Sequence, residues 1–401
     1  MVTSAYSFQP HLISLRRRNV GPIVRITPDE LHFNDPEFYE VVYSSGQNID
    51  KPLWAKYQFG SPGTLFSAVD SATHRIRRAS LNPFFSKQKV LQQEDTIRRQ
   101  VDKTCARLNE EFCGTSNVVR ADYMFASTSC DIVADYAFGQ SYNMLDAPKF
   151  MSPFIYSIDS FKKSGLYNVA FPFLPRLIGW LPESWLAFMM PQVLPSLQFK
   201  KVNKFFPGSA FIPLISYEAI SEQIVEILQQ RAEGDVKSQG TIFTEITNAK
   251  LPPEEMKLWR LTDEADGIVA AALETTKRSL SVMIFYVLSN QSILKNLRQE
   301  LGSVMPDSTT LPTISELEKL PYLTAVIQEG MLPLVKKMMT ALTLLGLRLG
   351  YGTVGRSPRM HKTRVLQYGQ YAIPPGTPPV SASTYTMHHN EDVFPDSHTW
   401  F

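Results

Sequence analysis

One short stretch of the sequence combines residue types that could move protons beside a bound ligand. The string AALETT, residues 271–276, places small residues directly before an acid and two hydroxyls in a long apolar context. Small residues let a flat ligand approach a helix backbone, while Glu274 and Thr275 could relay protons or hold water next to it. A structural threonine, whose hydroxyl bonds to a carbonyl one turn earlier, is the alternative, and the string alone leaves both open.

Two further pairs of side chains have spacings that suit the recognition of charge. His74 and Arg78 are four residues apart, so on a helix both point from one face and could together bind a carboxylate. Glu329 and Arg348 would form Glu-x-x-Arg, an ion pair between positions i and i+3 of one helix, if residues 331–346 were absent.

The cysteines do not suggest a metal or redox centre. Cys105, Cys113 and Cys130 are an odd set with no CxxC or histidine-rich spacing, which argues against a disulfide framework, zinc or a thiol redox pair. We expect three buried thiols in a reducing compartment.

An acidic triplet supports a different enzyme class. Asp263, Glu264 and Asp266 resemble a magnesium motif on a helix, which would suit a helical terpene cyclase. No second metal motif follows downstream, and acids near a helix N-terminus are favourable without any metal. The cyclase is therefore the minor alternative.

Composition and hydropathy exclude some partners. The net charge is +2, from 40 basic and 38 acidic residues, and the basic clusters at 16–18 and 75–78 are too short for a nucleic-acid footprint. No run of eighteen apolar residues exists, and the N-terminus lacks the apolar core of a signal peptide or anchor. Residues 166–197 are apolar but broken by five prolines, so they suit either a lid that touches lipid headgroups or ordinary core helices.

The pattern of apolar residues predicts a mainly α fold with a small β-sheet. Apolar residues that recur three and four positions apart predict helices at residues 87–111, 121–137, 216–231, 262–289 and 314–329. Strand-like runs lie at residues 23–33 and after residue 353, with a PPG turn at 374–376. With no linker or repeat, we expect one domain over residues 1–401, whose sheet is assembled from both ends of the chain.

Together these pieces resemble the cytochromes P-450, the haem-thiolate monooxygenases, of the fungal secondary-metabolism type similar to trichodiene oxygenase. The resemblance runs in family order along nearly the whole chain, through GPIVRITPDELHF, HRIRRASLNPFFSK, AALETT, the split EG and LR, GRSPR, IPPGTPPVSASTYTMHH and FPDSHTW. Haem b would then be the cofactor, and NADPH-cytochrome reductase would supply electrons for oxidation of an apolar, terpenoid or polyketide-like substrate. The resemblance implies the cytosolic face of the endoplasmic reticulum membrane, with peripheral membrane contact, although the missing anchor would suit the cytoplasm.

The resemblance also gives roles to individual residues. His74 and Arg78 match donors to one haem propionate, and Arg356 in GRSPR matches a second donor. Glu274 and Thr275 match the acid-alcohol pair that delivers protons during dioxygen cleavage. Glu329 and Arg348 match the structural Glu-x-x-Arg pair. Ala272 stands where the family usually has a groove glycine.

The sequence departs from the family at the iron ligand. The family places an axial Cys in a loop of type F-x-x-G-x-x-x-C-x-G, and the sequence ends at Phe401 before that loop. We therefore expect a chain truncated at both ends, with no metal ligand, doubtful haem binding and no activity as written. An inactive remnant or a mis-predicted gene product is the alternative to a monooxygenase.

Residues 331–346 form an aberrant insertion in this interpretation. Codon degeneracy permits a fungal-type intron start at Gly330 and an intron end at Gly346, which would remove 3 × 16 = 48 nucleotides in frame. The segment is therefore predicted to be a translated intron, with a genuine surface insertion as the alternative.

Overall fold

A computed structural model describes the greater part of the chain. The described residues are 23–44, 48–57, 61–152, 155, 184–185, 217–232, 241–249, 251–306, 312–330, 357–376 and 378–383. Beyond the first two residues, the chain divides into two compact units, residues 48–274 and residues 3–47 with 275–401.

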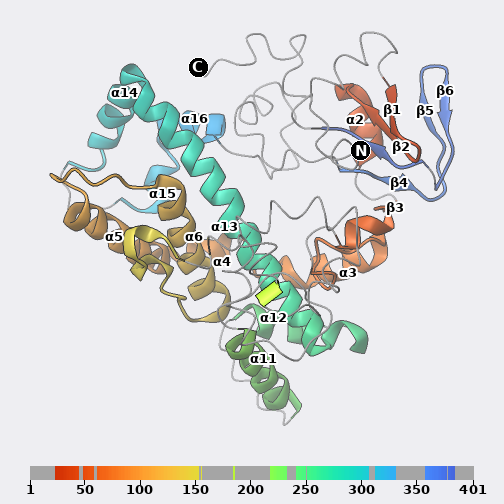
Figure 1. Cartoon of the computed structure of the whole chain (residues 1–401), viewed down its shortest axis with the longest axis horizontal. Helices are drawn as coiled ribbons and strands as arrows, with labels where there is room; N and C mark the ends of the chain where they lie inside the picture. The colour runs from red at the N-terminus through yellow and green to blue at the C-terminus, as the bar shows by residue number, and fades with distance from the viewer. Residues whose placement is uncertain are drawn as a thin grey trace. The chain divides into compact units, whose positions relative to one another are not determined.

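The first unit is helical (Figure 1). Its strand is β3, Ile49–Asp50, and its 3₁₀ turns are η2, Leu53–Tyr57, η3, Met144–Asp146, η4, Pro148–Phe150, and η7, Pro253–Met256. Its helices are α3, Ser71–Leu81, α4, Lys87–Leu91, α5, Glu94–Glu111, α6, Ala121–Phe138, α11, Tyr217–Ala232, α12, Ile242–Asn248, and the first half of α13, Leu258–Ser289.

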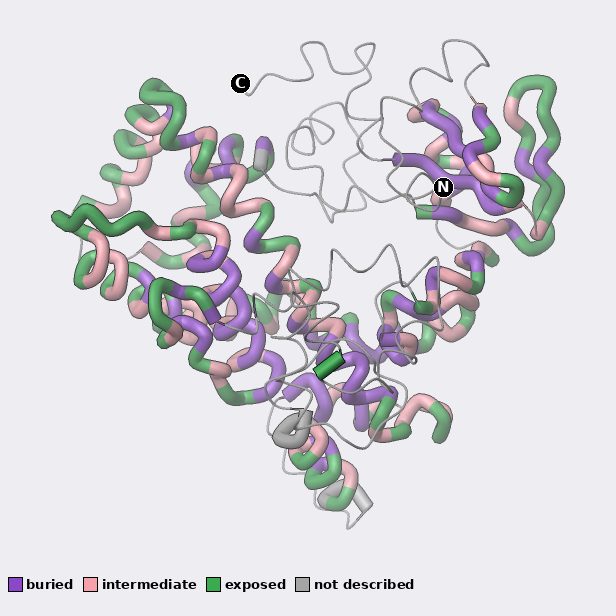
Figure 2. The backbone as a smooth tube through the Cα atoms, in the orientation of Figure 1, coloured by how far each residue is buried: buried purple, intermediate pink, exposed green. Residues whose placement is uncertain are grey.

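Helix α6 lies at the centre of the core of this unit. It packs along α5 and contacts α12, and Figure 2 shows most of its length buried. Its sequence, ADYMFASTSCDIVADYAF, is rich in Ala and Ser, which let neighbouring helices approach closely while Met124, Val133 and Phe138 supply apolar volume. Gly139, at a φ of +72°, ends the helix in the left-handed conformation that glycine adopts without strain.

The second unit contains the sheet. Its strands are β1, Ile23–Thr27, β2, Glu30–Phe33, β4, Met360–His361, β5, Leu366–Tyr368, β6, Tyr371–Ile373, and β7, Val380–Ser381. Strand β2 pairs antiparallel with β1 and parallel with β7, through Leu31 opposite Val380. The predicted small sheet from both ends of the chain is confirmed.

The helices of the second unit are α2, Pro36–Tyr43, the last part of α13, α14, Gln291–Gly302, α15, Ile314–Leu317, and α16, Pro321–Gly330. Three of them start at sequence-encoded caps. Asp35 and Asn290 cap α2 and α14 with side-chain oxygens, and Thr313 forms a capping box with Glu316 at α15.

Several predicted boundaries need correction. The predicted helix 87–111 is broken between α4 and α5 at Gln92 and Gln93, and the predicted helix 314–329 is broken before Pro321, because a proline disfavours helical geometry in the residue before it. Helix α13 begins at Leu258, four residues before the predicted start at residue 262. Most of the apolar region 166–197 lies outside the described residues.

The expectation of three buried cysteines is wrong for two of them. Cys130 is buried in α6, but Cys105 and Cys113 are exposed, because the helical face of α5 that carries Cys105 does not face α6 and Cys113 follows the end of that helix. Within the described part of the chain, no helix combines the length and the apolar character needed to cross a bilayer.

Candidate functional site

Helix α3 presents the predicted pair His74 and Arg78 together. Both lie on one helix, one turn apart, as the spacing predicted. His74 is half-buried and Arg78 is exposed. Arg78 Nε donates to Asn82 Oδ1 over 2.8 Å on the same helix, which holds the guanidinium at the C-terminal turn of α3.

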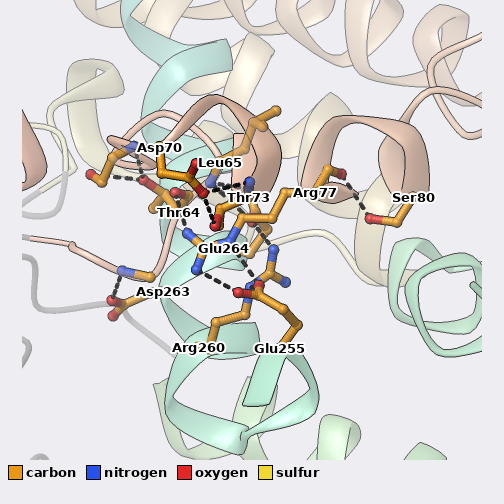
Figure 3. A network of polar contacts seen from close by, with 12 residues as sticks. Thr64, Leu65, Asp70, Thr73, Arg77, Ser80, Glu255, Arg260, Asp263 and Glu264 are labelled. Carbon is orange, nitrogen blue, oxygen red and sulfur yellow. Dashed lines mark hydrogen bonds and ion pairs between the residues drawn. The ribbon is translucent and has the colours of Figure 1, made fainter. Parts of the chain in front are cut away.

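The neighbouring residue Arg77 points the other way, into a buried polar network (Figure 3). Arg77 makes a two-pronged ion pair with Glu255 of η7, with Nε to Oε2 at 2.7 Å and Nη2 to Oε1 at 3.0 Å. Arg77 Nη1 also donates to the carbonyl of Thr64 over 2.9 Å. The Arg77 side chain therefore connects α3 both to η7 and to Thr64, which lies in the segment before α3.

Arg260 of α13 extends this network. Its side chain is 1% exposed; Nε lies 3.0 Å from Glu255 Oε2 and Nη2 lies 2.7 Å from Glu264 Oε2. Two guanidinium groups, Arg77 and Arg260, thus share Glu255. The shared carboxylate has a lowered pKa because hydrogen bonds and charge from Arg77, reinforced by Arg260, outweigh the opposing effect of burial.

The carboxylates on α13 bind the backbone of residues 61–67. Asp263 Oδ2 accepts the Gly63 N–H over 2.8 Å, and both oxygens of Glu264 accept the Leu65 N–H at 3.1 Å. A Cβ at Gly63 would lie 2.8 Å from Asp263 Oδ2, so the contact requires glycine. The segment is therefore held against α13 through its own amides.

Burial raises the pKa values of these acids. Desolvation raises the pKa of Asp263 to about 6, against the opposing hydrogen bond from Gly63, and raises that of Glu264 despite Arg260. The pKa of Asp266 is raised well above its ordinary value, because the group is fully buried and has the Asp263 charge nearby. Asp266 Oδ1 has no hydrogen-bond partner among the described residues.

These contacts correct the magnesium interpretation of the acidic triplet. Asp263, Glu264 and Asp266 lie in the second and third turns of α13, not at its N-terminus, since the helix begins at Leu258. The carboxylates of Asp263 and Glu264 are committed to backbone amides and to Arg260. Among the residues that the structure describes, no group of three acids, histidines or cysteines could hold a metal ion.

The acid-alcohol pair lies further along α13. Glu274 is half-buried and Thr275 is exposed, while the preceding Leu273 is fully buried in the core. Ala271 and Ala272 precede it, so small side chains border the pair on the N-terminal side. Helix α13 thus contains both the buried network near residues 260–266 and, about two turns later, the predicted pair Glu274 and Thr275.

Three further predicted site residues are Glu329, Arg348 and Arg356. Glu329 lies in α16 and is 8% exposed. Arg348, Arg356 and the predicted insertion 331–346 lie outside the described residues. The Glu329–Arg348 ion pair and the second propionate donor therefore stay predictions.

Among the described residues, His74 and Arg78 could bind a haem propionate, whereas no residue is assigned as the thiolate ligand of the iron. Arg78 and His74 lie together on one face of α3, and Arg78 is exposed, as a donor to an anionic group must be before the group binds. Neither Cys130 nor Cys105 favours the thiolate form. Burial raises the pKa of Cys130 far above its usual range, and it raises that of Cys105 too, while Cys113 is exposed beyond the end of α5.

Sequence reasoning did not single out Arg77, Glu255, Arg260 or Gly63. The pair Arg260 and Glu264 has the i, i+4 spacing of a helical ion pair and could have been found. The contact of Arg77 with Glu255 joins residues 178 positions apart, and no local spacing encodes it.

Comparison with known proteins defines the family. The model of the family described as Cytochrome P450 matches residues 9–332. A cytochrome P450 monooxygenase of Eupenicillium brefeldianum, orf6, is 34% identical over 362 residues, which cover 90% of this chain and 65% of that protein. The cytochrome P450 monooxygenase MO6277 of Ascocoryne sarcoides is 32% identical, over 96% of this chain and 70% of that protein. The cytochrome P450 monooxygenase tpcC of Cochliobolus heterostrophus is 34% identical, over 95% of this chain and 67% of that protein.

The chain belongs to the cytochrome P450 family, in agreement with its mainly α fold and with the resemblance seen in the sequence. It spans about two thirds of the length of the curated relatives that it matches. Haem is the cofactor of this family, and its monooxygenases generally need a redox partner.

Proposed function

We propose that the protein is a haem-dependent monooxygenase that inserts one oxygen atom of O₂ into an apolar substrate of terpenoid or polyketide-like type. The observation that carries this proposal is the similarity to cytochrome P450 monooxygenases over nine-tenths or more of the chain. The electrons would come from NADPH-cytochrome reductase, at the cytosolic face of the endoplasmic reticulum.

In this proposal, α3 holds the haem by its propionates. His74 and Arg78 donate to one carboxylate, and Arg356 is the second donor. Their common face on α3, and the diversion of Arg77 into the buried network, support this assignment. A charge-assisted bond from a guanidinium to a carboxylate contributes about 1.5–3 kcal/mol.

A bound haem would supply the oxidising chemistry at its iron, and the residues of α13 would supply protons. Glu274 would take up protons from solvent, which its half-buried position permits. The Thr275 hydroxyl, which both donates and accepts, would pass a proton onward and hold water in line. Ala271 and Ala272 would leave room for a flat ligand beside the helix.

In this proposal the axial thiolate is none of Cys105, Cys113 and Cys130, because Cys105 and Cys130 lie within helices and Cys113 lies directly after one, outside a loop of the family's haem-ligand type. The second candidate is a catalytically inactive remnant or a mis-predicted product of the same gene. The two candidates differ in one measurable respect, which is whether the gene's transcript encodes a haem-ligand loop.

Residues 331–346 are the second feature of the gene that a transcript would test. We propose that they are a translated intron. The family model stops matching at residue 332, just after Gly330, while the alignment to the Ascocoryne sarcoides protein covers 96% of the chain and so includes both sides of the segment. Reads that join Gly330 directly to Leu347 would support the proposal, and reads that always keep the 48 nucleotides (16 codons × 3) would overturn it.

The propionate assignment is tested by titrating the chain with haemin and following the haem absorbance. Without a thiolate, binding will be weak, but the ratio between variants remains informative. Arg78→Gln and His74→Gln should each lower the affinity by roughly tenfold or more, the loss of one charge-assisted bond.

Arg75→Gln is the matched control. Arg75 is an exposed arginine on the same helix, three residues before Arg78, and it should change the affinity by less than about threefold. Equal losses for Arg75→Gln and Arg78→Gln would show that haemin responds to overall positive charge, and the assignment of Arg78 would then be wrong.

A further inference from the structure

The polar network of Figure 3 holds more acids than bases. Around the two guanidiniums of Arg77 and Arg260, Figure 3 shows the carboxylates of Glu255, Glu264 and Asp263, and the buried Asp266 adds a fourth beside Asp263. Every one of these six side chains is buried or nearly so. Two carboxylates, Glu255 and Glu264, contact guanidinium groups directly and balance the two positive charges. The other two have no cation in contact with them in the described part of the chain.

Asp263 is the uncompensated acid that touches the segment 61–67. It accepts the Gly63 N–H on one side, and on α13 its neighbours are Arg260, Glu264 and Asp266. From α3 it faces Arg77, and from η7 the network adds Glu255. The segment 61–67 contributes no titratable side chain of its own. The segment can therefore respond to pH only through the acids that hold it.

The packing at this contact is close. A Cβ at Gly267 would lie 2.7 Å from Thr64 Cγ2, and Asp263 lies equally close to the position of a Cβ at Gly63. Thr64 is fixed in addition by Arg77 through its carbonyl and by Ser67 through its hydroxyl. Asp263 is 3% exposed while the segment lies against α13, so movement of the segment away from the helix would admit solvent to it.

We propose that Asp263 and Glu264 are positioning residues that form a proton-linked latch, which holds residues 61–67 against α13 more firmly when Asp263 is protonated. The proposal rests on the proposed function in one respect only, which is that α3 carries the candidate propionate donors and α13 carries the candidate proton-transfer residues. The latch itself is a property of the buried contact, and its test measures backbone amides rather than oxidation.

The direction follows from the hydration of the carboxylate. In the latched state Asp263 is desolvated and its pKa is about 6; when the segment opens, water reaches the group and its pKa returns toward 3.8. The latched state therefore binds the proton more tightly, and opening releases it. Lowering the pH through about 6 strengthens the latch, while above that pH the buried charge weakens it. The Gly63 N–H keeps an acceptor throughout, because a protonated carboxyl retains its carbonyl oxygen.

Hydrogen exchange at the Gly63 and Leu65 amides of the whole chain tests the latch. After correction for intrinsic exchange, protection should rise roughly tenfold between about pH 7.5 and about pH 5, since pH 5 lies about one unit below the pKa of the latched state while the open state stays ionised. In Asp263→Asn the amide side chain still offers an oxygen to Gly63 but does not titrate, so the rise should be lost.

The chain supplies two matched controls. Glu300 likewise accepts backbone amides, those of Tyr322 and Leu323 at 2.8 and 2.7 Å, but it is half-buried, and protection of those amides should not rise over this interval. Asp146→Asn removes an exposed carboxylate, whose side chain is 58% exposed, and should leave the rise at Gly63 intact.

Three results would overturn the proposal. They are flat or falling protection at Gly63 in the unmodified chain, an equal rise at Tyr322 and Leu323, and an undiminished rise in Asp263→Asn. The first two need no variant, so the test stands even if Asp263→Asn fails to fold. Failure of haemin binding would leave these results unchanged, because no haem is present in the experiment.

Discussion

Replacing Arg77 with Met is the perturbation whose cost can be worked most fully from the contacts. Methionine keeps much of the side-chain volume and removes the guanidinium. The substitution breaks a two-pronged pair with Glu255, at 2.7 and 3.0 Å, in which the two side chains are 9% and 12% exposed, and it leaves the Thr64 carbonyl without its 2.9 Å donor. Removing one partner of a buried ion pair costs about 3–5 kcal/mol.

The lower end of that range applies here. Glu255 keeps the second guanidinium, that of Arg260, at 3.0 Å, so its charge is not left alone. Loss of the bond to Thr64 adds about 1 kcal/mol. We therefore expect Arg77→Met to lower the free energy of unfolding by about 3–4 kcal/mol.

Chemical denaturation followed by circular dichroism measures this loss, with Arg99→Met as the control. Arg99 pairs with Asp135 at 3.1 Å, but its side chain is 63% exposed, and such surface pairs contribute about 0–1 kcal/mol. In the double variant Arg77→Met/Glu255→Gln, the stranded acid is neutralised and part of the loss should return. A loss for Arg77→Met no larger than that for Arg99→Met, or strictly additive losses in the double variant, would refute the reasoning.

Three further outcomes follow from the same contacts and from the proposed chemistry. Gly267→Ala should lower the free energy of unfolding by about 1–3 kcal/mol, because the new Cβ forces Thr64 away from α13. Gly302→Ala, whose Cβ meets nothing within 4 Å, should be neutral, and equal effects of the two substitutions in thermal unfolding would contradict this. The stability of the unmodified chain relative to Asp263→Asn should increase by about 1.4 kcal/mol from about pH 7.5 to about pH 5, because the folded state takes up a proton with a pKa of about 6; a decrease in urea midpoints would reverse the assigned sign. In a version that includes a haem-ligand loop, Thr275→Ala and Glu274→Gln should raise peroxide formed per electron pair consumed, and unchanged coupling in both would return this pair to a structural role.

Much of the fold is encoded locally and was predictable. The strand segments at both ends of the chain, the helix that carries His74 and Arg78, and helix α6 follow from apolar periodicity and from capping residues such as Asp70 and Gly139. The breaks before Glu94 and Pro321 were missed because apolar spacing continues across them while the backbone does not.

The buried network could not be predicted in the same way. Asp263 and Glu264 look like a metal motif or a helix N-terminal charge cluster in the sequence, and only the approach of Gly63 and Leu65, about 200 residues earlier in the chain, shows what they bind. The resemblance to the family likewise gave His74 and Arg78 a role but said nothing of Arg77 between them. Long-range pairing of polar groups depends on tertiary packing, which a single sequence does not display.

The reduced carbon-monoxide difference spectrum tests the proposed haem-thiolate function most directly. It is measured on two versions of the protein, the 401-residue chain and a version extended by a haem-ligand loop of the family's type and lacking residues 331–346. We predict a thiolate-type band for the second version and none for the first, because Cys105 and Cys130 lie within helices and Cys113 directly after one, outside a loop of the family's haem-ligand type. A thiolate-type band from the 401-residue chain would contradict the account of its cysteines, and no such band from either version would contradict the haem monooxygenase itself.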